Sequence, residues 1–509
     1  GEAPYLAARL QAAAEPGTVA IADATRRLLG RRFVLHDLGR LRLKGFALPI
    51  QAWRVLGADG DRDRFTALRG APRGPMLGRR HELALLLDRW QQARDGEGQA
   101  ILLTGEAGIG KSRLIWELRA AIAAMPHRVL RLQGSPHHRD SAFHPLAEML
   151  RHEAGLRHDE PPEAGIGRLE AMLALPARRA WAAALLADLL DLAGAAARSG
   201  EPDPRRRKAL AMQALLDHLA GLAARHPLLI VHDDLHWTDP STLQLLDQLI
   251  ERLPRLPLLL LLASRPEPPL PWTGRGQLTS LALGRLPRRH AAALIGAVAA
   301  DRALPAPVID DILVRADGVP LFLEELVRAV LAGGPMTGGQ VAGEQAASGH
   351  DAAVPATLEG SLAARLDRLP AARPILQLAA VIGREFPSDV LAEASALPMG
   401  ELRRGVEDLV GAGLVRRTGS AEHESLAFGH ALLRDAAYGS LLREQRRGLH
   451  ARVATALERT TPTVAPEVLA YHRAEAGLIE QAVTHWGQAG ERSLRRYAGE
   501  EAAGHFRRA

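Results

Sequence analysis

The segment GEAGIGKS, residues Gly105 to Ser112, indicates the fold of this sequence more clearly than any other stretch. It matches the pattern G-x-x-x-x-G-K-[ST] in full, and it directly follows the short apolar run Ala100–Thr104, a predicted buried strand. Glycines in this pattern let successive backbone N–H groups turn toward one phosphate. The helix predicted to begin at Lys111 adds the positive end of its dipole. The segment is therefore predicted to be a phosphate-binding loop.

The side chains of this loop have separate expected roles. The side chain of Lys111 is expected to reach the β- and γ-phosphates, and the hydroxyl of Ser112 is expected to coordinate Mg²⁺. A glycine-rich turn before a helix is the alternative, and the strand that precedes the loop disfavours it. The nucleotide-binding residues predicted here are Gly105, Glu106, Ala107, Gly108, Ile109, Gly110, Lys111, Ser112 and Arg113.

A second predicted strand, Leu228–Val231, ends in polar residues. His232, Asp233 and Asp234 follow it directly, so an acidic pair stands at the end of an apolar run. Asp233 is expected to hold Mg²⁺ through water or together with Ser112, and Asp234 is placed where a carboxylate could orient the attacking water. A strand that ends in a simple polar turn is the alternative, and its occurrence together with the phosphate-binding loop disfavours it.

A third apolar run, Leu258–Ala263, is followed by Ser264 and Arg265. A cationic residue at such a strand end could sense the γ-phosphate. The alternative is that Arg265 is simply one of the many arginines of this sequence. The predicted catalytic residues are Lys111, Asp233, Asp234 and Arg265, and the predicted metal ligands are Ser112 and Asp233.

The composition is that of an ordinary globular protein, with 509 residues of which 47% are hydrophobic. There is no cysteine, which excludes disulfides, a thiol nucleophile and Cys-ligated zinc. The net charge of +6 is interpreted as a solvated surface, because arginines are not interleaved with aromatic residues. The longest apolar run, Ala180–Ala187, is too short to span a membrane. We expect a cytoplasmic protein without a membrane partner, and a fragment, since the sequence starts at Gly1 and stops within a helical pattern at Ala509.

Short apolar runs alternate with helical patterns from Met76 to about Leu331, which is typical of β–α–β units around a parallel sheet. Polar segments rich in glycine and proline predict linkers. The predicted divisions are an N-terminal segment (1–57), a linker (58–75), the α/β core (76–270), a small helical part (271–332), a flexible linker (333–355), a helical part with a hairpin near Leu414–Phe428 (356–456) and a helical segment (457–509).

Taken together, these motifs resemble the STAND class of signal-transduction ATPases, which are relatives of AAA+ proteins. The sequence looks in particular like the bacterial ATPases fused behind a class III adenylate/guanylate cyclase domain. The resemblance implies an α/β P-loop NTPase with helices on both faces of a parallel sheet, a helical lid at 271–332, and ATP or ADP with Mg²⁺ as ligands. It rests on Gly78–Glu82 (GRRHE), Gly105–Ser112, Asp233–Trp237 (DDLHW), Ser264–Glu267 (SRPE) and Gly318–Pro320 (GVP).

Further site residues follow only from this resemblance. It implies that the backbone of Gly78 and Arg79 lies near adenine and that Pro320 packs near the base. It also implies a winged-helix domain at 356–456, in which His430 would touch the β-phosphate and report ADP or ATP. A histidine without nucleotide contact is the alternative for this last residue.

Residues 1–57 resemble the end of an α+β class III cyclase domain. Arg9 stands where the family has an arginine that stabilises the transition-state phosphate, but Tyr5 occupies the position of its ribose-orienting asparagine. The two metal-binding aspartates of the family would lie upstream of this sequence. We therefore expect no cyclase activity from this segment, because metal charge is central to phosphoryl chemistry.

Residues 457–509 resemble the start of a tetratricopeptide-type helical array. Two segments, Glu480–Trp486 and Glu500–Phe506, share positions for small and aromatic residues. Such arrays bind proteins and need neighbouring repeats to bury their faces, so we expect protein partners at this end. A generic helical hairpin is the alternative. A homo-oligomer that forms with nucleotide is a further hypothesis about partners.

Three functions remain open at this point. The leading one is an ATP-binding regulatory switch in bacterial signal transduction, with slow Mg²⁺-dependent hydrolysis because no arginine finger is identified. The second is the regulatory part of a nucleotide cyclase. The third is a winged-helix DNA-binding regulator. Segment 401–412, the candidate recognition helix, disfavours this function, because it carries three acidic residues beside the basic Arg403 and Arg404, and a DNA-reading face should be more basic. Nucleic acid is accordingly not the expected partner.

Overall fold

The computed structural model describes most of the chain in long runs. The described residues are 76–156, 161–175, 178–190, 203–266, 278–300, 304–332, 369–419, 424–429, 431–461 and 464–509, with shorter pieces within 6–58 and the single residues Leu192, Trp272 and Arg302. The predicted linkers 59–75 and 333–355 lie outside the described residues, and so do His430, Tyr5 and Glu267.

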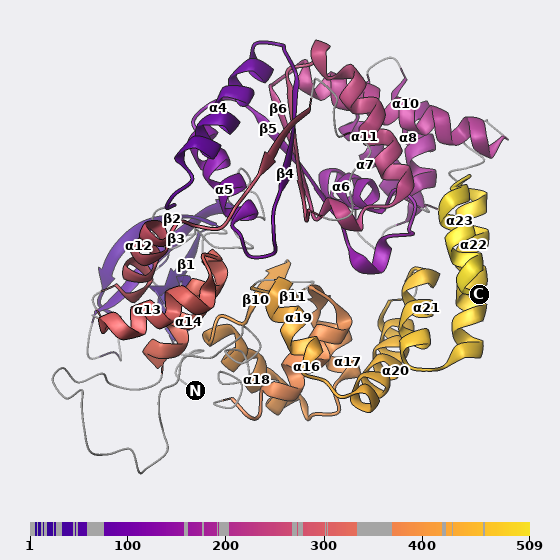
Figure 1. Ribbon diagram of the computed structural model, residues 1–509. Helices are drawn as coiled ribbons and strands as arrows, with labels where there is room; N and C mark the ends of the chain where they lie inside the picture. The colour runs from indigo at the N-terminus through magenta and orange to yellow at the C-terminus, as the bar shows by residue number, and fades with distance from the viewer. Residues whose placement is uncertain are drawn as a thin grey trace.

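A parallel sheet lies at the centre of residues 76–282 (Figure 1). Among the described residues, five strands run side by side in the order β5-β6-β7-β4-β8. β6 and β7 are buried along their whole length, as their runs of Leu, Ile and Val predict for parallel strands covered on both faces. The strands are β4 (Gln99–Thr104), β5 (Arg128–Gln133), β6 (Leu228–Asp233), β7 (Leu258–Ser264) and β8 (Leu278–Ala282).

Helices cover both faces of this sheet, because successive strand residues point to opposite faces. Ile101 of β4 packs with α4 (Arg80–Arg94) and α5 (Lys111–Ile122), whereas its neighbour Leu102 packs with the helices of the other face. The helices of that second face are α6 (His144–Ala154), α7 (Pro162–Met172), α8 (Arg179–Leu189), α10 (Pro204–Ala223) and α11 (Pro240–Arg252). The predicted α/β P-loop NTPase fold is confirmed for this core.

The carboxyl ends of the strands lie in line at one edge of the sheet, which we call the strand-end edge. Thr104 at the end of β4 pairs in register with Ser264 of β7, and Gln133 of β5 pairs with Asp233 of β6. Since the strands are parallel, the loops that follow them leave from this same edge. Ligands of parallel α/β sheets bind outside this edge, so the fold itself points to the candidate site.

Strand β8 corrects the predicted end of the α/β core at residue 270, because it pairs with β4 and extends the sheet to Ala282. Its residues alternate in burial, as expected of an edge strand, so the segment lacks the continuous apolar run that identified β4, β6 and β7. The other edge strand, β5, was not predicted either, since Arg128 and Arg131 interrupt its apolar residues. Three helices beyond β8 share one apolar cluster. We call them the lid after the prediction for this segment, and their role as a lid stays a prediction. They are α12 (Arg288–Ala299), α13 (Ala306–Ala316) and α14 (Pro320–Ala332).

Residues 369–461, which we call the C-terminal unit, have their own apolar core. The hairpin predicted near Leu414–Phe428 is formed by β10 (Val415–Gly419) and β11 (Glu424–Phe428). β9 (Glu385–Pro387) pairs with β11, which gives an antiparallel sheet in the order β10-β11-β9. The helices of the unit are α16 (Arg373–Ile382), α17 (Ser388–Ala394), α18 (Met399–Gly411), α19 (Ala431–Gly439) and α20 (Arg443–Thr460). The assignment of this unit as a winged helix stays a prediction.

Three helices follow the C-terminal unit and return to the core (Figure 1). They are α21 (Pro466–Glu475), α22 (Ile479–Arg495) and α23 (Gly499–Arg508). α22 and α23 pack closely, since a β-carbon at Gly490 would lie 2.5 Å from the ring of Phe506. Glu501 of α23 accepts a hydrogen bond from the Ser241 amide at the start of α11 (2.9 Å). The end of the sequence is thus fastened to the core.

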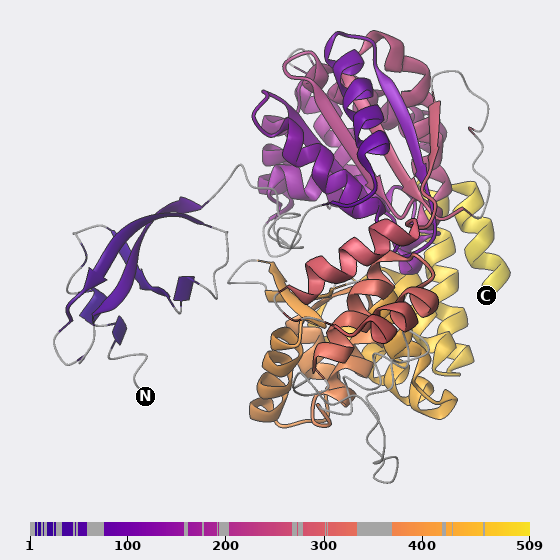
Figure 2. The same ribbon diagram turned by 60° about the vertical axis from the view of Figure 1, so that its left-hand side comes forward.

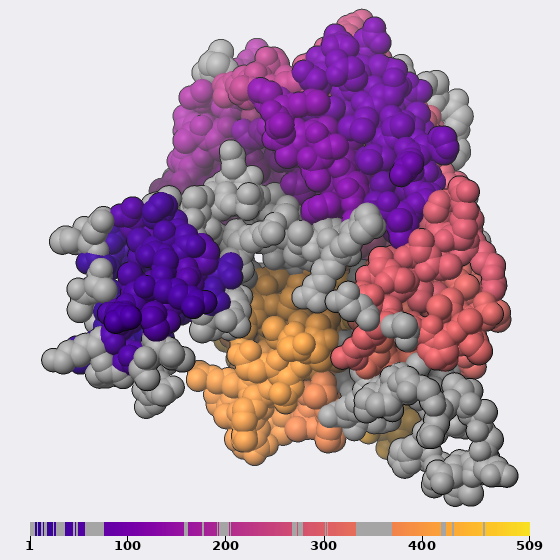
Figure 3. All heavy atoms as spheres, turned by 90° about the vertical axis from the view of Figure 1, so that its left-hand side faces the viewer, coloured from indigo at the N-terminus to yellow at the C-terminus, as the bar shows by residue number. Residues whose placement is uncertain are grey.

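The N-terminal segment forms a small antiparallel sheet in the order β1-β3-β2, set to one side of the core in Figure 2. Its strands are β1 (Val19–Ala22), β2 (Phe33–Leu41) and β3 (Ile50–Ala58). Figure 3 shows the core above, with the lid and the C-terminal unit beneath it. Within the part of the chain that the structure describes, every helix is too short or too polar to traverse a bilayer.

Candidate nucleotide-binding site

The predicted phosphate-binding loop joins β4 to α5 at the strand-end edge. Gly105, Gly108 and Gly110 have φ angles of 159°, 80° and 107°, in the region that side chains disfavour. At Gly105 space is also restricted, because a β-carbon would lie 2.8 Å from Cγ2 of Ile109. The glycine pattern of the sequence is therefore required by the conformation of the loop.

Lys111 lies at the start of α5, and its side chain folds back over the loop. Its Nζ donates hydrogen bonds to the carbonyls of Gly105 (2.6 Å) and Glu106 (3.0 Å). Burial lowers the pKa of Lys111 below its ordinary value, while the nearby carboxylates of Asp234 and Asp233 act in the opposite direction. A partly buried cation at the start of a helix, next to a glycine-rich loop, suits a polyanionic ligand.

The predicted acidic pair lies at the end of β6, beside the loop. Asp233 is 4% exposed and accepts a hydrogen bond from Nη2 of Arg131 on β5 (3.1 Å). Before it, His232 is buried, and burial lowers the pKa of this histidine to about 4. His232 is therefore neutral at pH 7, and no cation stands directly behind the carboxylate of Asp233 on its own strand.

Asp234 differs from Asp233 in its backbone and in its partners. Its φ of 53° is left-handed, a conformation that aspartate tolerates better than most residues. Its Oδ2 accepts a hydrogen bond from Nε2 of Gln133 at the end of β5 (2.8 Å) and a second from Nη1 of Arg384 (2.5 Å). Arg384 belongs to the C-terminal unit, where it lies between α16 and β9. The carboxylate predicted to orient water is thus held from two sides.

Arg265 follows β7, the strand between the phosphate-loop strand and the acidic strand. Its guanidinium lies 3.8 Å from the carboxylate of Asp435 on α19 of the C-terminal unit. The charges of Arg265, Asp233 and Asp234 all act on Lys111, so the structure brings together the four residues predicted as catalytic. Their roles stay predictions.

The residues that the resemblance placed near the base lie where the core meets the lid. A β-carbon at Gly78 would lie 2.8 Å from the ring of His290 on α12, and Arg79 is buried and contacts the carbonyl of Gly284. Pro320 begins α14. The structure thus places Gly78, Arg79 and Pro320 around the same end of the lid, whereas His430 lies outside the described residues.

The lid contacts the phosphate-binding loop directly. The amide of Leu321 on α14 donates a hydrogen bond to the carbonyl of Gly108 (3.3 Å). A β-carbon at Gly108 would lie 3.0 Å from Cβ of Leu321 and 3.3 Å from Cδ1 of Leu432 on α19. One glycine of the loop is therefore hydrogen-bonded to the lid and lies beside the C-terminal unit.

Comparison with known protein families gives one match within this geometry. Residues 75–262 match the family model described as AAA ATPase domain, a segment that includes the phosphate-binding loop and the acidic strand end. These residues form an AAA ATPase domain. Such a domain implies nucleotide binding, usually with Mg²⁺. Lys111 and the backbone amides of the loop are hydrogen-bond donors, which suit the phosphates of a nucleotide.

One curated relative matches almost the whole chain. It is a protein of Rhizobium meliloti (strain 1021) described as uncharacterized, and it is 32% identical over 511 residues. The match covers 98% of this chain and 48% of the relative, so the chain spans about half the length of the relative that it matches.

Three solved structures are similar to this chain at low sequence identity and low TM-score. A signal transduction ATPase with numerous domains (STAND) from Pyrococcus horikoshii, with a tetratricopeptide repeat sensor, gives a TM-score of 0.46 at 11% identity, over 86% of this chain and 56% of that one. Drosophila ORC bound to DNA gives 0.31 at 11% identity, over 74% and 90%. A RuvB mutant from Thermotoga maritima gives 0.31 at 14% identity, over 68% and 93%.

Sequence reasoning missed four polar residues that line the strand-end edge of the AAA ATPase domain. Arg131 and Gln133 lie on β5. That strand pairs with β6 and ends at the same edge of the sheet, which could have suggested its polar residues as part of the site. Arg384 and Asp435 carry no comparable signal, because they lie more than a hundred residues further along the chain. Only the packing of the C-terminal unit brings them to this edge.

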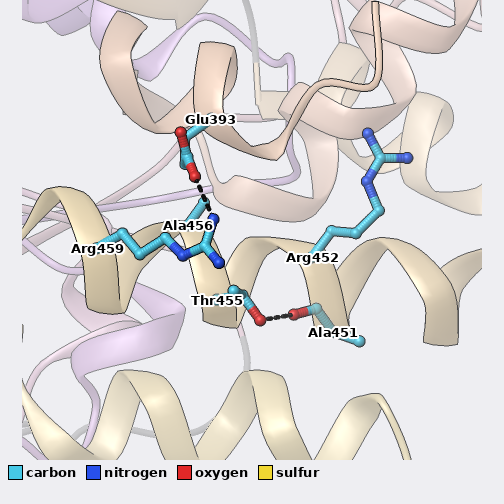
Figure 4. A pocket seen from close by; sticks show the side chains of 6 residues that line it. All are labelled: Glu393, Ala451, Arg452, Thr455, Ala456 and Arg459. Carbon is cyan, nitrogen blue, oxygen red and sulfur yellow. Dashed lines mark hydrogen bonds and ion pairs between the residues drawn. The ribbon is translucent and has the colours of Figure 1, made fainter.

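A pocket of about 250 Å³ lies elsewhere, between α17 and α20 of the C-terminal unit (Figure 4). Glu393 and Arg459 form an ion pair across it (2.9 Å), and Arg452 donates to the carbonyl of Ala394. The pocket contains no residue of the AAA ATPase domain, so we do not connect it with the nucleotide. Its lining residues are Glu393, Ala451, Arg452, Thr455, Ala456 and Arg459.

Proposed function

We propose that this chain is an ATP-binding regulatory switch of the STAND type, acting in bacterial signal transduction with slow Mg²⁺-dependent hydrolysis. The observation that carries the proposal is the position of one loop residue, Gly108, which is hydrogen-bonded to the lid and lies beside Leu432 of the C-terminal unit. A ligand seated on this loop meets three parts of the molecule at once. Its phosphates can therefore bias how these parts are arranged, which is what a nucleotide switch requires.

The residues at the strand-end edge fit a nucleotide with Mg²⁺. The loop amides and Lys111 would hold the phosphates, and Ser112 with Asp233 would hold Mg²⁺, which supplies positive charge to the phosphoryl group. Asp234 would orient the attacking water, and Arg265 would contact the γ-phosphate. Gly78, Arg79 and Pro320 would surround the base, and His430 would contact the β-phosphate.

The remaining assignments are proposed with less support from contacts. They are the winged helix at 356–456, the repeat-like helices at 457–509 with their protein partners, the homo-oligomer, the cytoplasmic location and the cyclase remnant at 1–57. The antiparallel sheet β1-β3-β2 is compatible with the remnant, so regulation of a nucleotide cyclase is kept as a second function. The DNA-binding alternative is weakened further, since Glu407 of α18 pairs with Arg417 and offsets its charge.

The test is nucleotide binding by the whole chain, with a matched lysine as control. Lys111→Ala is expected to weaken ATP binding at least about tenfold, because it removes the cation that faces the phosphates. Lys208→Ala is the control, since Nζ of Lys208 donates to the hydroxyl of Ser241 (2.9 Å) and lies over the ring of Phe143. Phosphate release and binding of ADP and GTP are followed in the same samples. Failure of the folded wild-type chain to bind any nucleotide would overturn the proposal.

A further inference from the structure

We propose that Arg384 of the C-terminal unit restrains the carboxylate of Asp234 and so holds back ATP hydrolysis until that unit moves. This inference rests on the proposed ATPase function and adds a named residue that regulates it. Arg384 is a positioning residue in this scheme, because it acts on the reaction through Asp234. The pair joins residues 150 positions apart in the sequence, with a distance of 2.5 Å between Nη1 and Oδ2.

The backbone of Arg384 is fixed within the C-terminal unit. Its carbonyl accepts a hydrogen bond from the amide of Phe428 (3.0 Å), and the next residue but one, Phe386, packs edge-on against the ring of Phe428 at a centroid distance of 5.9 Å. Both aromatic rings are buried in the core of the unit. The guanidinium therefore cannot leave Asp234 through backbone fraying alone. It leaves when its side chain turns or when the unit shifts.

A second ion pair of opposite polarity lies beside the first. Asp435 of α19 faces Arg265, and its neighbour Arg434 donates from Nε to the carbonyl of Ala380 on α16 (2.9 Å). α16 leads directly to Arg384, so the two pairing residues belong to one packed body. The C-terminal unit thus presents a cation to the predicted base and an anion to the predicted γ-phosphate sensor. Because both pairing residues belong to this one packed body, a shift of the C-terminal unit releases the two ion pairs together.

The Asp234 carboxylate has two hydrogen-bond partners, Gln133 and Arg384, and their chemistry explains why the contact with Arg384 inhibits hydrolysis. A carboxylate that accepts a strong hydrogen bond from a guanidinium has a lone pair occupied and attracts a proton from water less well. Gln133 leaves the charge of Asp234 unchanged, whereas Arg384 offsets it. A γ-phosphate brought to Arg265 would compete with Asp435 and weaken the second pair. Binding of ATP therefore favours release of Asp234, which is completed only when the C-terminal unit moves.

The experiment compares steady-state hydrolysis by the whole chain with and without the guanidinium. Arg384→Gln is expected to raise kcat about fivefold with little change in KM, since the pair is partly exposed and of moderate strength. Arg384→Lys keeps the charge and is expected to stay near the wild-type rate. Arg417→Gln is the matched control, because Arg417 lies in the same unit and pairs with Glu407 and Glu424 there.

Each outcome separates this inference from the proposed function. If wild-type protein binds ATP through Lys111 but Arg384→Gln is no faster, the restraint is wrong while the nucleotide switch stands. A lower kcat for Arg384→Gln would also overturn it, since the arginine would then assist the reaction. Hydrolysis that stays undetectable in both proteins counts against the restraint as well. Melting temperatures of all variants identify any loss of folding.

Discussion

Two of the seams between the AAA ATPase domain and the rest of the chain differ in chemistry. At the strand-end edge the contacts are ion pairs, Arg384 with Asp234 and Asp435 with Arg265, whose side chains are between 28% and 44% exposed. Pairs of this kind contribute little to stability and are weakened by other ions. This charged seam can therefore yield to a ligand that carries its own charges.

The second seam lies between the short helix η1 (Pro136–His138) and helices α20 and α21, and it is made of buried rings. His137 stacks against His472 at a centroid distance of 5.8 Å and contacts Tyr471 edge-on. Nδ1 of His450 lies 2.9 Å from Nδ1 of His472, and its Nε2 lies 3.0 Å from the hydroxyl of Tyr438. A direct hydrogen bond between two imidazoles requires at least one of them to be neutral.

This difference in chemistry indicates that the charged seam opens when nucleotide binds and that the histidine seam stays closed. Phosphate groups can compete for the charged seam, but they offer nothing to a seam of neutral imidazole and phenol rings. We therefore expect nucleotide to shift the C-terminal unit at the strand-end edge while the histidine seam keeps the chain docked. Acid should have the reverse preference, because the buried imidazoles of the histidine seam take up protons near pH 6.5 only when the seam opens or the chain unfolds.

Acid should produce the largest effect, and it should act at the histidine seam. Burial lowers the pKa of His137 to about 3 and that of His450 to about 4, and the cations Arg434 and Arg446 lie near the seam, with Glu475 opposing them. Because the folded-state pKa is below the unfolded value near 6.5, the stability is present above about pH 6.5 and is lost as pH falls toward 4. The loss at pH 5 is on the order of 2 kcal/mol for each buried histidine.

The measurement is the melting temperature of the whole chain between pH 7.5 and 5. His137→Phe is the informative variant, because neither ring nitrogen of His137 has a hydrogen-bond partner among the described residues and the ring packing can be kept. It should reduce the loss of stability in acid. An unchanged pH dependence in this variant would show that the seam does not titrate as proposed.

Gly108→Ala should have the next largest effect, and it acts where both moving parts meet the loop. A side chain there is strained at φ of 80° and presses on Leu321 and Leu432, so we expect a loss of about 1–2 kcal/mol in stability and weaker ATP binding. Gly167→Ala is the control, since Gly167 lies in α7 with nothing within 4 Å of a β-carbon. Equal effects of the two substitutions in denaturant unfolding would contradict the role given to the loop.

Asp435→Asn should have the smallest effect and would rank the two ion pairs of the charged seam. The 3.8 Å separation and high exposure predict a weaker restraint than that of Arg384, so hydrolysis should rise only about twofold. Single-turnover phosphate release measures this change. A larger increase than that of Arg384→Gln would reverse the ranking and place the main restraint on Arg265.

The sequence predicted the elements whose signals are local. The loop from Gly105 to Ser112, the buried strands β6 and β7 and the hairpin near Leu414–Phe428 all depend on neighbouring residues, and each is present. The catalytic candidates Asp233 and Asp234 could be placed because parallel strands end at one edge. The two edge strands of the core, β5 and β8, were missed, since polar residues interrupt their apolar patterns.

The two seams could not be predicted, because their residues are far apart in the chain. Asp234 meets Arg384 across 150 positions, and His137 meets residues more than 300 positions away. An isolated arginine or histidine in a sequence with many of both carries no pattern. These contacts follow only from how the C-terminal unit and α21 pack on the core.

The most direct test of the central claim is the distance between the core and the C-terminal unit with each nucleotide bound. The sequence has no cysteine, so Glu97→Cys and Arg403→Cys, both at exposed positions, give two unique sites for spin labels. The account predicts different distance distributions with Mg²⁺–ATP and Mg²⁺–ADP, and no difference when Lys111→Ala is added. Identical distributions at saturating ATP and ADP would contradict it.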